Sequence, residues 1–199
     1  MAEYFVRHGQ TDWNLEHRIQ GTVDIELNDA GVQQAVDMRE KLSSHTFAVI
    51  FTSPFKRAAQ TARIIAEAHA ATPLIESPEL AERNFGRFEG EHNSPEGDYY
   101  GVWDHNRDTD TEGGESLEDL EARVYPFLDK IREEYDGKDI LLVAHGGIGL
   151  IVRQYYRGRP ESGNLLDLPP VANGEVEILA IDERPWRVCS VRMMRPYAK

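Results

Sequence analysis

Two arginines and two histidines stand just past the ends of three short apolar runs in the sequence: Arg7, His8, Arg57 and His145. An arginine guanidinium can hold two oxygens of an anion through parallel hydrogen bonds. A neutral imidazole can attack an electrophile or accept a proton near neutral pH. Each residue alone is weak evidence, because a single histidine at a strand end is more often structural. Brought together, they would form a concentrated anion site that contains a nucleophile.

Hydrophobic periodicity identifies the elements that have to position these side chains. Apolar runs typical of buried strands cover residues 4–6, 48–53 and 139–144. A short strand flanked by prolines is expected in 73–80, and closing strands are expected in 175–182 and 186–193. Helical spacing predicts helices in 26–42, 53–68, 116–135 and 146–156. Residues 83–115 are polar and rich in Gly, Asp and Glu, and we interpret them mainly as an excursion from this pattern.

Capping residues and prolines predict where these helices begin and where they are interrupted. Asn28 and Ser116 are suited to accept a backbone N–H of the first turn of the first and third helices. Ser53 is expected to cap the second helix, with Pro54 at its first position. Pro126 is expected to kink or break the third helix, because proline lacks a backbone N–H.

Strands and helices that alternate along the chain predict the α/β class, with a mostly parallel central sheet flanked by helices. The 199 residues, of which 40% are hydrophobic, suffice for one core, so we expect a single domain over residues 1–199. Ligands bind open α/β sheets beyond the carboxyl ends of the strands. The two arginines and two histidines are therefore expected at one edge of the sheet.

The charge balance restricts the possible partners. The formal net charge is −13 and the pI is about 5.0, so nucleic acids and anionic membranes would be repelled.

No apolar run approaches the ~20 residues of a membrane helix and no signal peptide is visible, so we expect a soluble cytoplasmic protein, monomeric or homodimeric. Cys189 is the only cysteine and is expected to be a small buried hydrophobe in a strand, without a disulfide.

Some of these residues could instead belong to a dinucleotide-binding site or to a metal site. The stretch HGGIG (145–149) lies between a strand and a helix, but it lacks the third glycine of a dinucleotide motif. His8, His145 and Glu82 could form a metal set, but two fixed arginine cations beside it would repel the ion. We therefore expect neither a metal nor a cofactor. The remaining histidines show no ligand spacing and are expected at the surface: His17, His45, His69, His92 and His105.

Six short motifs follow one another along nearly the whole chain: RHGQTDWN (7–14), RIQG (18–21), SPFKRAAQTA (53–62), ELAERNFGRFEG (79–90), GGES (113–116) and VAHGG (143–147). Their order resembles the histidine phosphatase superfamily, also called the phosphoglycerate mutase-like superfamily. The resemblance implies a three-layer α/β sandwich of the phosphoglycerate mutase-like fold. It also implies a metal-independent phosphatase that acts on a small phosphorylated metabolite.

The resemblance further implies roles for individual residues. His8 would accept the phosphoryl group and Glu82 would be the general acid and base. Glu82 is selected among several neighbouring acids because the family has an acid shortly before the pattern FG.FEG. The phosphate pocket would consist of Arg7, Arg57 and His145. Supporting contacts are implied for Asn14, Gln20, Gly21 and the amide of Gly146.

This set of side chains could transfer a phosphoryl group without a metal. Neutral His8 would attack phosphorus in line, while its other ring nitrogen donates to a fixed acceptor such as a backbone carbonyl. The neighbouring cations should lower the pKa of His8. The two guanidinium groups and a protonated His145 would hold the phosphoryl oxygens. Glu82 would protonate the leaving oxygen and later accept a proton from the attacking water.

Three functions remain open on these grounds. The leading one is phosphomonoester hydrolysis, the second is a cofactor-dependent phosphoglycerate mutase, and the third is a phospholigand-binding domain, which would not need Glu82. The resembling mutases cover the site with a long insertion before GES and with a C-terminal tail. In this chain NFGRFEGEHN (84–93) stands where the mutases have the pattern YG.L.G followed by Asn-Lys. The segment 83–115 between Glu82 and Ser116 is short, and few residues follow the last predicted strand. Water should therefore reach the phosphoenzyme.

Overall fold

The computed structural model describes residues 2–93, 98–107, 111–169 and 171–179. Its strands are β1 (Glu3–Arg7), β2 (Val49–Thr52), β3 (Leu74–Glu76), β4 (Ile140–Ala144) and β5 (Val176–Leu179). Its α-helices are α1 (Asp12–Leu15), α2 (Asp29–Leu42), α3 (Lys56–Ala66), α4 (Leu117–Glu134) and α5 (Gly146–Arg157). The 3₁₀ helices are η1 (Pro78–Leu80), η2 (Gly86–Phe88), η3 (Asp98–Trp103) and η4 (Leu165–Asp167).

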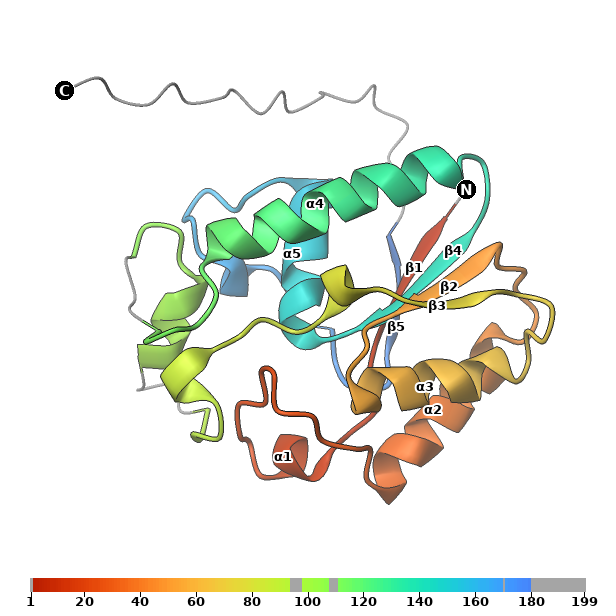
Figure 1. Cartoon of the computed structure of the whole chain (residues 1–199), viewed down its shortest axis with the longest axis horizontal. Coiled ribbons are helices and arrows are strands. Elements are labelled where there is room, and N and C mark those ends of the chain that lie inside the picture. The colour runs from red at the N-terminus through yellow and green to blue at the C-terminus, as the bar shows by residue number, and fades with distance from the viewer. Residues whose placement is uncertain (1, 94–97, 108–110, 170, 180–199) are drawn as a thin grey trace.

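The strands form one sheet in the order β3-β2-β4-β1-β5 (Figure 1). β1, β2, β3 and β4 are parallel to one another, and β5 pairs with β1 in the antiparallel sense. This confirms the predicted α/β class with a mostly parallel sheet. The run 73–80 contributes only a short strand, after which the chain turns into η1.

Helices cover both faces of the sheet, with α4 and α5 on one side and α2 and α3 on the other (Figure 1). Neighbouring strand residues face opposite layers: Phe5 and Leu142 belong to the core cluster under α4 and α5. Val6 and Val143 belong to the cluster under α2 and α3. Because both faces of the strands are buried, these strands appear in the sequence as continuous apolar runs. The arrangement confirms the three-layer sandwich.

Two predicted helix caps are confirmed, and the predicted start of α3 is wrong. Asn28 and Ser116 cap α2 and α4 by accepting a backbone N–H. Ser53 does not cap α3 and Pro54 is not its first residue, because the backbone N–H of Ser53 donates to the Val143 carbonyl of β4 at 3.0 Å and keeps Ser53 at the end of the sheet. Phe55 is the N-cap and the helix begins at Lys56. Pro126 does not break α4, which continues on both sides of it, since buried residues of that helix such as Leu128 anchor it on the sheet.

The expectation of surface histidines is correct only in part. His17 and His92 are exposed, and His45 is half-buried. His69 is buried and packs edge-on against Phe47, with 5.1 Å between the ring centroids. The side chain of His105 is only 2% exposed. Both were mispredicted because residues far away in the sequence cover them. The predicted strand 186–193 with Cys189 lies outside the described residues.

Candidate active site

The register of the parallel strands places His8 beside His145. Arg7 lies opposite Ala144 in the pairing of β1 with β4. The next residue, His8, donates its backbone N–H to the Ala144 carbonyl at 3.0 Å, and His145 directly follows Ala144. The centroids of the two imidazole rings are 5.2 Å apart. The carboxyl ends of β1 and β4 therefore bring these two side chains together.

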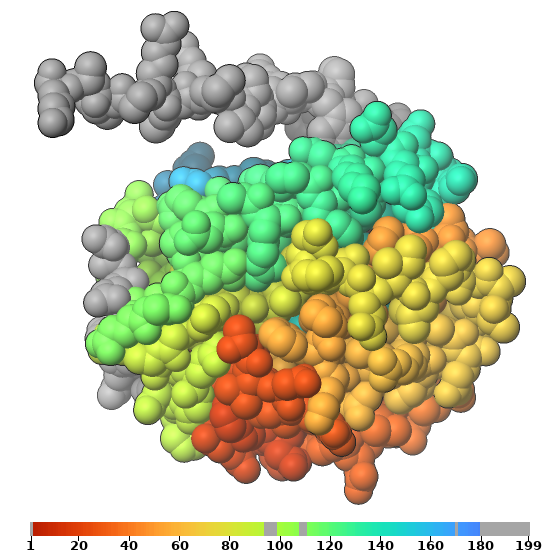
Figure 2. All heavy atoms as spheres, viewed as in Figure 1, coloured from red at the N-terminus to blue at the C-terminus, as the bar shows by residue number. Residues whose placement is uncertain are grey.

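Other parts of the chain gather at the same edge. Figure 2 shows the N-terminal loops (red), the start of α3 (orange) and the segment after β3 (yellow) meeting on one face of the molecule. An isolated bridge between Arg18 and His92 links the first and last of these segments. These loops surround the carboxyl ends of the strands, where ligands bind in sheets of this kind.

His8 is buried, and one of its ring nitrogens is already engaged. Nδ1 lies 2.7 Å from the carbonyl oxygen of Gly9. A carbonyl only accepts, so Nδ1 carries the proton and Nε2 keeps its lone pair. Burial, followed by the charges of Arg57 and Arg7, holds the pKa of His8 well below its usual 6.5. His8 is therefore a neutral imidazole of fixed tautomer at neutral pH.

The backbone that carries His8 is locked against α2 and α3. The Gly9 N–H donates to Oγ1 of Thr61 at 3.1 Å. A side chain on Gly9 would come within 2.3 Å of the Gly31 carbonyl oxygen, so only glycine fits this approach to α2. The Thr61 hydroxyl in turn donates to the carbonyl of Arg57 at 2.8 Å. These contacts connect the position of His8 to that of Arg57.

Arg57 is fully buried in the first turn of α3, and its guanidinium ties three segments together. Nε donates to Nδ1 of His145 at 3.2 Å. Nη1 and Nη2 each donate at 2.8 Å, to the carbonyls of Val23 and Gly21 respectively. Burial lowers the pKa of Arg57 to about 10, so the side chain remains a cation at neutral pH. The predicted neighbourhood of Arg57 with His145 is thus present in the structure.

Gly21 has the backbone conformation and the close packing that require glycine. Its φ is +51°, and a side chain there would come within 2.1 Å of Oε1 of Glu89. The same carboxylate accepts the backbone N–H of Thr22 at 2.8 Å and that of Phe85 at 3.1 Å. Glu89 therefore joins the loop around Gly21 to the segment that follows Glu82.

His145 is fully buried and neutral in this arrangement. Its Nδ1 accepts from Nε of Arg57, and its Nε2 lies 2.7 Å from Oγ of Ser53. An arginine Nε–H only donates, so Nδ1 carries no proton. Burial, followed by the charges of Arg57 and His8, holds the pKa of His145 well below 6.5. The expectation of a protonated His145 is therefore wrong here, because a buried guanidinium occupies the nitrogen that would have to be protonated.

Arg7 lies against the start of α5. Its Nη1 donates to the carbonyl of Val171 at 3.0 Å. A side chain on Gly146 would come within 3.4 Å of Cζ of Arg7, so this glycine leaves room for the guanidinium. Within the described part of the chain, the buried Nε of Arg7 has no hydrogen-bond partner. That donor is suited to bind an anion at this edge.

Glu82 reaches the same edge from the segment after η1. Its Oε1 accepts the backbone N–H of Arg83 at 2.9 Å, and its Oε2 accepts that of Gly147 at 3.0 Å. Gly147 lies in the first turn of α5, where the N–H groups lack helical partners and the helix dipole attracts a carboxylate. The structure thus places Glu82 beside the amide of Gly147, one residue beyond the predicted Gly146.

The predicted supporting residues Asn14 and Gln20 differ in their contacts. Oδ1 of Asn14 lies 3.4 Å from Nδ2 of Asn173, which also donates to the His8 carbonyl at 2.9 Å. Asn14 is thus linked to the backbone of His8 through a single intermediate side chain. Gln20 is buried, and its Oε1 has no hydrogen-bond partner among the described residues.

Several side chains that support the site were not predicted to do so: Ser53, Thr61, Trp103 and Asn173. Thr61 could have been found from its spacing, since a residue four positions after Arg57 lies on the same side of the helix. Asn173 contacts His8 across 165 positions of sequence, and no local pattern indicates such a contact.

Neither a metal cluster nor a membrane span is evident in the described ranges. No group of three or more His, Cys, Asp or Glu side chains there is arranged to hold a metal ion. Nδ1 of His8 is engaged by a carbonyl, and both carboxylate oxygens of Glu82 are engaged by backbone amides. None of the described helices combines the length and the apolar character needed to cross a bilayer.

The model of the histidine phosphatase superfamily (branch 1) matches residues 4–193, and the chain belongs to that superfamily. It is 32% identical over 193 residues to the metal-independent phosphoserine phosphatase of Arabidopsis thaliana, covering 93% of this chain and 78% of that protein. It is 40% identical over 149 residues to the 2,3-bisphosphoglycerate-dependent phosphoglycerate mutase of Cytophaga hutchinsonii, covering 71% of this chain and 70% of that protein.

A solved structure of mycobacterial glucosyl-3-phosphoglycerate phosphatase in complex with VO3 has the same fold. The TM-score is 0.78 at 27% sequence identity, with 89% of this chain and 91% of that chain covered. The predicted family and its phosphoglycerate mutase-like fold are therefore confirmed, and both phosphatases and mutases occur among the similar proteins.

Proposed function

We propose that this protein hydrolyses phosphomonoesters through a phosphohistidine on His8, with Glu82 as general acid and base. The main support for this proposal is the tautomer and the orientation of the His8 imidazole. Its Nδ1–H is bound to the Gly9 carbonyl, so the lone pair is on Nε2 at an edge that also holds Arg7 and Arg57. A neutral, oriented imidazole beside two guanidinium groups is what nucleophilic attack on a phosphate requires.

In the first half-reaction, Nε2 of His8 attacks phosphorus and the bond from phosphorus to the leaving oxygen breaks. Protonated Glu82 gives its proton to that oxygen, so the product leaves as a neutral alcohol. The guanidinium of Arg7 neutralises charge on the phosphoryl oxygens, with its buried Nε as one donor. The nitrogens of Arg57 already donate to His145 and to two backbone carbonyls. Arg57 therefore stabilises the phosphoryl group through its positive charge and does not bind its oxygens directly.

In the second half-reaction, water attacks the phosphohistidine. The carboxylate of Glu82 takes a proton from that water as the bond between phosphorus and Nε2 breaks. Inorganic phosphate leaves, and His8 returns to the neutral tautomer held by Gly9. Splitting one displacement into two steps explains why a nucleophile and a proton carrier are both needed, and a binding domain would not require Glu82.

Hydrolysis is proposed in preference to the mutase reaction. The segment 83–115, which would carry the long cover of a mutase, is short here. A mutase has to protect its phosphohistidine from water, and little chain is available for that cover. The substrate we propose is a small phosphorylated metabolite.

The test is to supply 3-phosphoglycerate with catalytic 2,3-bisphosphoglycerate and to follow isomer and free phosphate by phosphorus NMR. A panel of other phosphomonoesters is screened in parallel for phosphate release. We expect phosphate to form from at least one member, and any isomer to form more slowly than phosphate. Faster isomer formation would establish the mutase instead. Binding of phosphate esters without any turnover would establish the non-catalytic domain.

A further inference from the structure

An indole ring forms one wall beside the carboxylate of Glu82. Trp103, at the end of η3, is only 2% exposed. A side chain on Gly147 would come within 2.6 Å of both Oε1 of Glu82 and Cη2 of Trp103. The carboxylate, the indole and the first turn of α5 therefore meet at one point. An apolar wall there limits the directions in which the carboxylate can turn and keeps water from that side.

Residues 98–107, which we call the strap, carry this indole. Upstream, Nη1 of Arg83 donates to the carbonyl of Val102 at 2.6 Å. Downstream, the strap is bound to the loop before η4: the His105 N–H donates to the Gly163 carbonyl at 3.0 Å, and Nδ2 of Asn106 donates to the Ser162 carbonyl at 2.7 Å.

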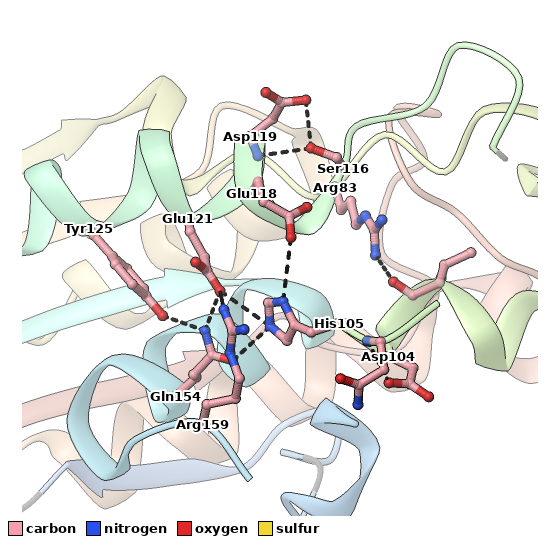
Figure 3. A network of polar contacts seen from close by, with 12 residues as sticks. Arg83, Asp104, His105, Ser116, Glu118, Asp119, Glu121, Tyr125, Gln154 and Arg159 are labelled. Atoms are coloured by element: carbon pink, nitrogen blue, oxygen red, sulfur yellow. Dashed lines mark hydrogen bonds and ion pairs between the residues drawn. The ribbon is translucent and has the colours of Figure 1, made fainter. Parts of the chain in front are cut away.

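The side chain of His105 binds the strap to α4 and α5 (Figure 3). Nε2 lies 2.9 Å from Oε1 of Gln154 and 3.2 Å from Oε1 of Glu121, and both oxygens are acceptors, so Nε2 carries a proton. Nδ1 faces Oε1 of Glu118 at 3.7 Å. Nε2 of Gln154 donates to Glu121 and to the hydroxyl of Tyr125, each at 2.5 Å.

The charges around this buried imidazole come from every packed element. Glu118 and Glu121 lie on α4, and Arg159 follows α5 with its guanidinium 3.3 Å from Oε1 of Glu121. On the strap itself, Asp104 and Arg107 pair with each other at 3.6 Å. A buried donor that binds an amide and a carboxylate gives directional contacts that a hydrophobic residue would not supply.

The strap and α5 are therefore joined at two points. At one, Trp103 packs against Gly147, whose amide binds Glu82. At the other, His105 binds Gln154. Residues 147–154 of α5 span about 10 Å, and the helix keeps these two points at a fixed distance from each other. Movement of His105 would be transmitted to Trp103, which lies two residues away, and so to the carboxylate.

We propose that His105 is a positioning residue that holds Trp103 against Glu82 and so fixes the direction in which Glu82 delivers its proton. This inference rests on the proposed function, because it requires Glu82 to act as the general acid. Loss of the contact would leave Arg7 and Arg57 in place and would weaken proton delivery. The defect would therefore depend on how much help the leaving group needs.

The experiment compares kcat/KM for phenyl phosphate, whose phenoxide leaves poorly, with that for p-nitrophenyl phosphate, whose leaving group needs less protonation. We expect His105→Ala to lower kcat/KM for phenyl phosphate by about 10- to 100-fold, as a misplaced catalytic group does, and to lower it much less for p-nitrophenyl phosphate. His105→Gln, which retains an N–H donor toward Gln154, should recover most of the loss.

Two further variants separate positioning from general destabilisation. Glu82→Gln should lower turnover of phenyl phosphate by about 10²- to 10⁴-fold, and adding His105→Ala to it should cause no further loss. His45→Ala removes a half-buried imidazole at the opposite edge of the sheet, where it packs 5.2 Å from the Tyr4 ring, so it should cost stability without leaving-group dependence.

The outcomes distinguish the two proposals. Equal losses for both substrates, or a full His105→Ala loss on top of Glu82→Gln, would overturn the positioning role while leaving the proposed function intact. Unchanged activity of Glu82→Gln would overturn the proposed function and the positioning role with it. A His105→Ala protein that fails to fold leaves His105→Gln as the deciding variant, which must then show a smaller loss of the same leaving-group dependence.

Discussion

His8 and His145 are neutral for different reasons at the level of single atoms. A carbonyl holds the proton of His8 on Nδ1, whereas a guanidinium keeps the proton of His145 off Nδ1. The two rings therefore have opposite tautomers, 5.2 Å apart. The reactive nitrogen of His8 is set by its neighbour Gly9, and the donor nitrogen of His145 is set by Ser53, which accepts from it at 2.7 Å.

The neutral state of His8 and His145 predicts how the stability of the protein depends on pH. In the folded protein the pKa values of His8 and His145 lie well below 6.5, so between those values and 6.5 the unfolded chain binds more protons. The free energy of unfolding should therefore fall as the pH is lowered through 6.5, by at most about 1.4 kcal/mol per pH unit for each group. His145→Gln, which cannot titrate, should show a shallower slope in urea unfolding between pH 7 and pH 5. A slope equal to that of the parent protein would contradict the neutral state of His145.

For single residues, the sequence predicted which residue types form the site better than it predicted their hydrogen-bond partners. His8, Arg57 and Glu82 were recognised because their types and motifs match a known chemistry, and the structure brings His8 and Arg57 to the predicted edge. The protonation of His145 was mispredicted because it depends on which atom of Arg57 faces it. Such hydrogen bonds join residues far apart in sequence, as Asn173 and His8 are, and local spacing carries no information on them.

Glycines shape the elements around the site where backbone and side chain come too close for any other residue. Gly21 combines a positive φ with a contact against Glu89, and its carbonyl accepts from the buried Arg57. Its position decides whether the loop after α1 can reach the start of α3. A methyl group at Gly21 would have to push away Glu89, which also holds the backbone of Thr22 and Phe85.

We therefore expect Gly21→Ala to reduce both stability and activity. Strain at positive φ together with the clash should cost about 1–3 kcal/mol of unfolding free energy. The kcat/KM should fall as well, because the carbonyl that orients Arg57 is displaced. The matched control is Gly137→Ala, whose φ is +74° and whose added methyl meets nothing within 4 Å. We expect the control to lose some stability and keep its activity. Equal activity in the two variants would contradict the role of Gly21 in orienting Arg57.

Element boundaries show where sequence patterns compete with tertiary contacts. Ser53 and Pro54 have the residue types of a helix start, yet the backbone of Ser53 completes the pairing with β4 and its hydroxyl binds His145. Pro126 has the type of a helix breaker, yet the buried residues around it keep α4 on the sheet. In both cases a contact made by the folded sheet outweighs a local preference.

The whole molecule is acidic, with a net charge of −13, while the predicted anion site contains the buried Arg57 and the half-buried Arg7. Alternation of apolar runs with helices was enough to predict the mostly parallel sheet, and the family resemblance implied its three layers. It was not enough to predict the strap, since short 3₁₀ helices have no periodic signature. The family match over residues 4–193 supports our proposal that the chain forms one domain.

Charge at this edge predicts independence of metal ions. Arg7 and Arg57 stay protonated at neutral pH and can take the role that a divalent cation has in other phosphoryl-transfer enzymes. We expect full activity after exhaustive EDTA treatment and dialysis, measured with the substrate that the screen identifies. Loss of activity that returned with one specific divalent ion would require a different account of how the phosphoryl charge is stabilised.

The central claim is a covalent phosphohistidine on His8, and its direct measurement is to trap that species. The enzyme is mixed with a ³²P-labelled phosphomonoester that it turns over, quenched within a turnover and digested for peptide mapping. We expect label on the peptide that contains His8, lost in acid and retained in alkali, as a phosphoramidate behaves and a phosphoserine does not. His8→Ala should carry no label and have no activity, while the exposed control His92→Ala should behave like the parent protein. Label on another residue, or full activity of His8→Ala, would contradict the claim.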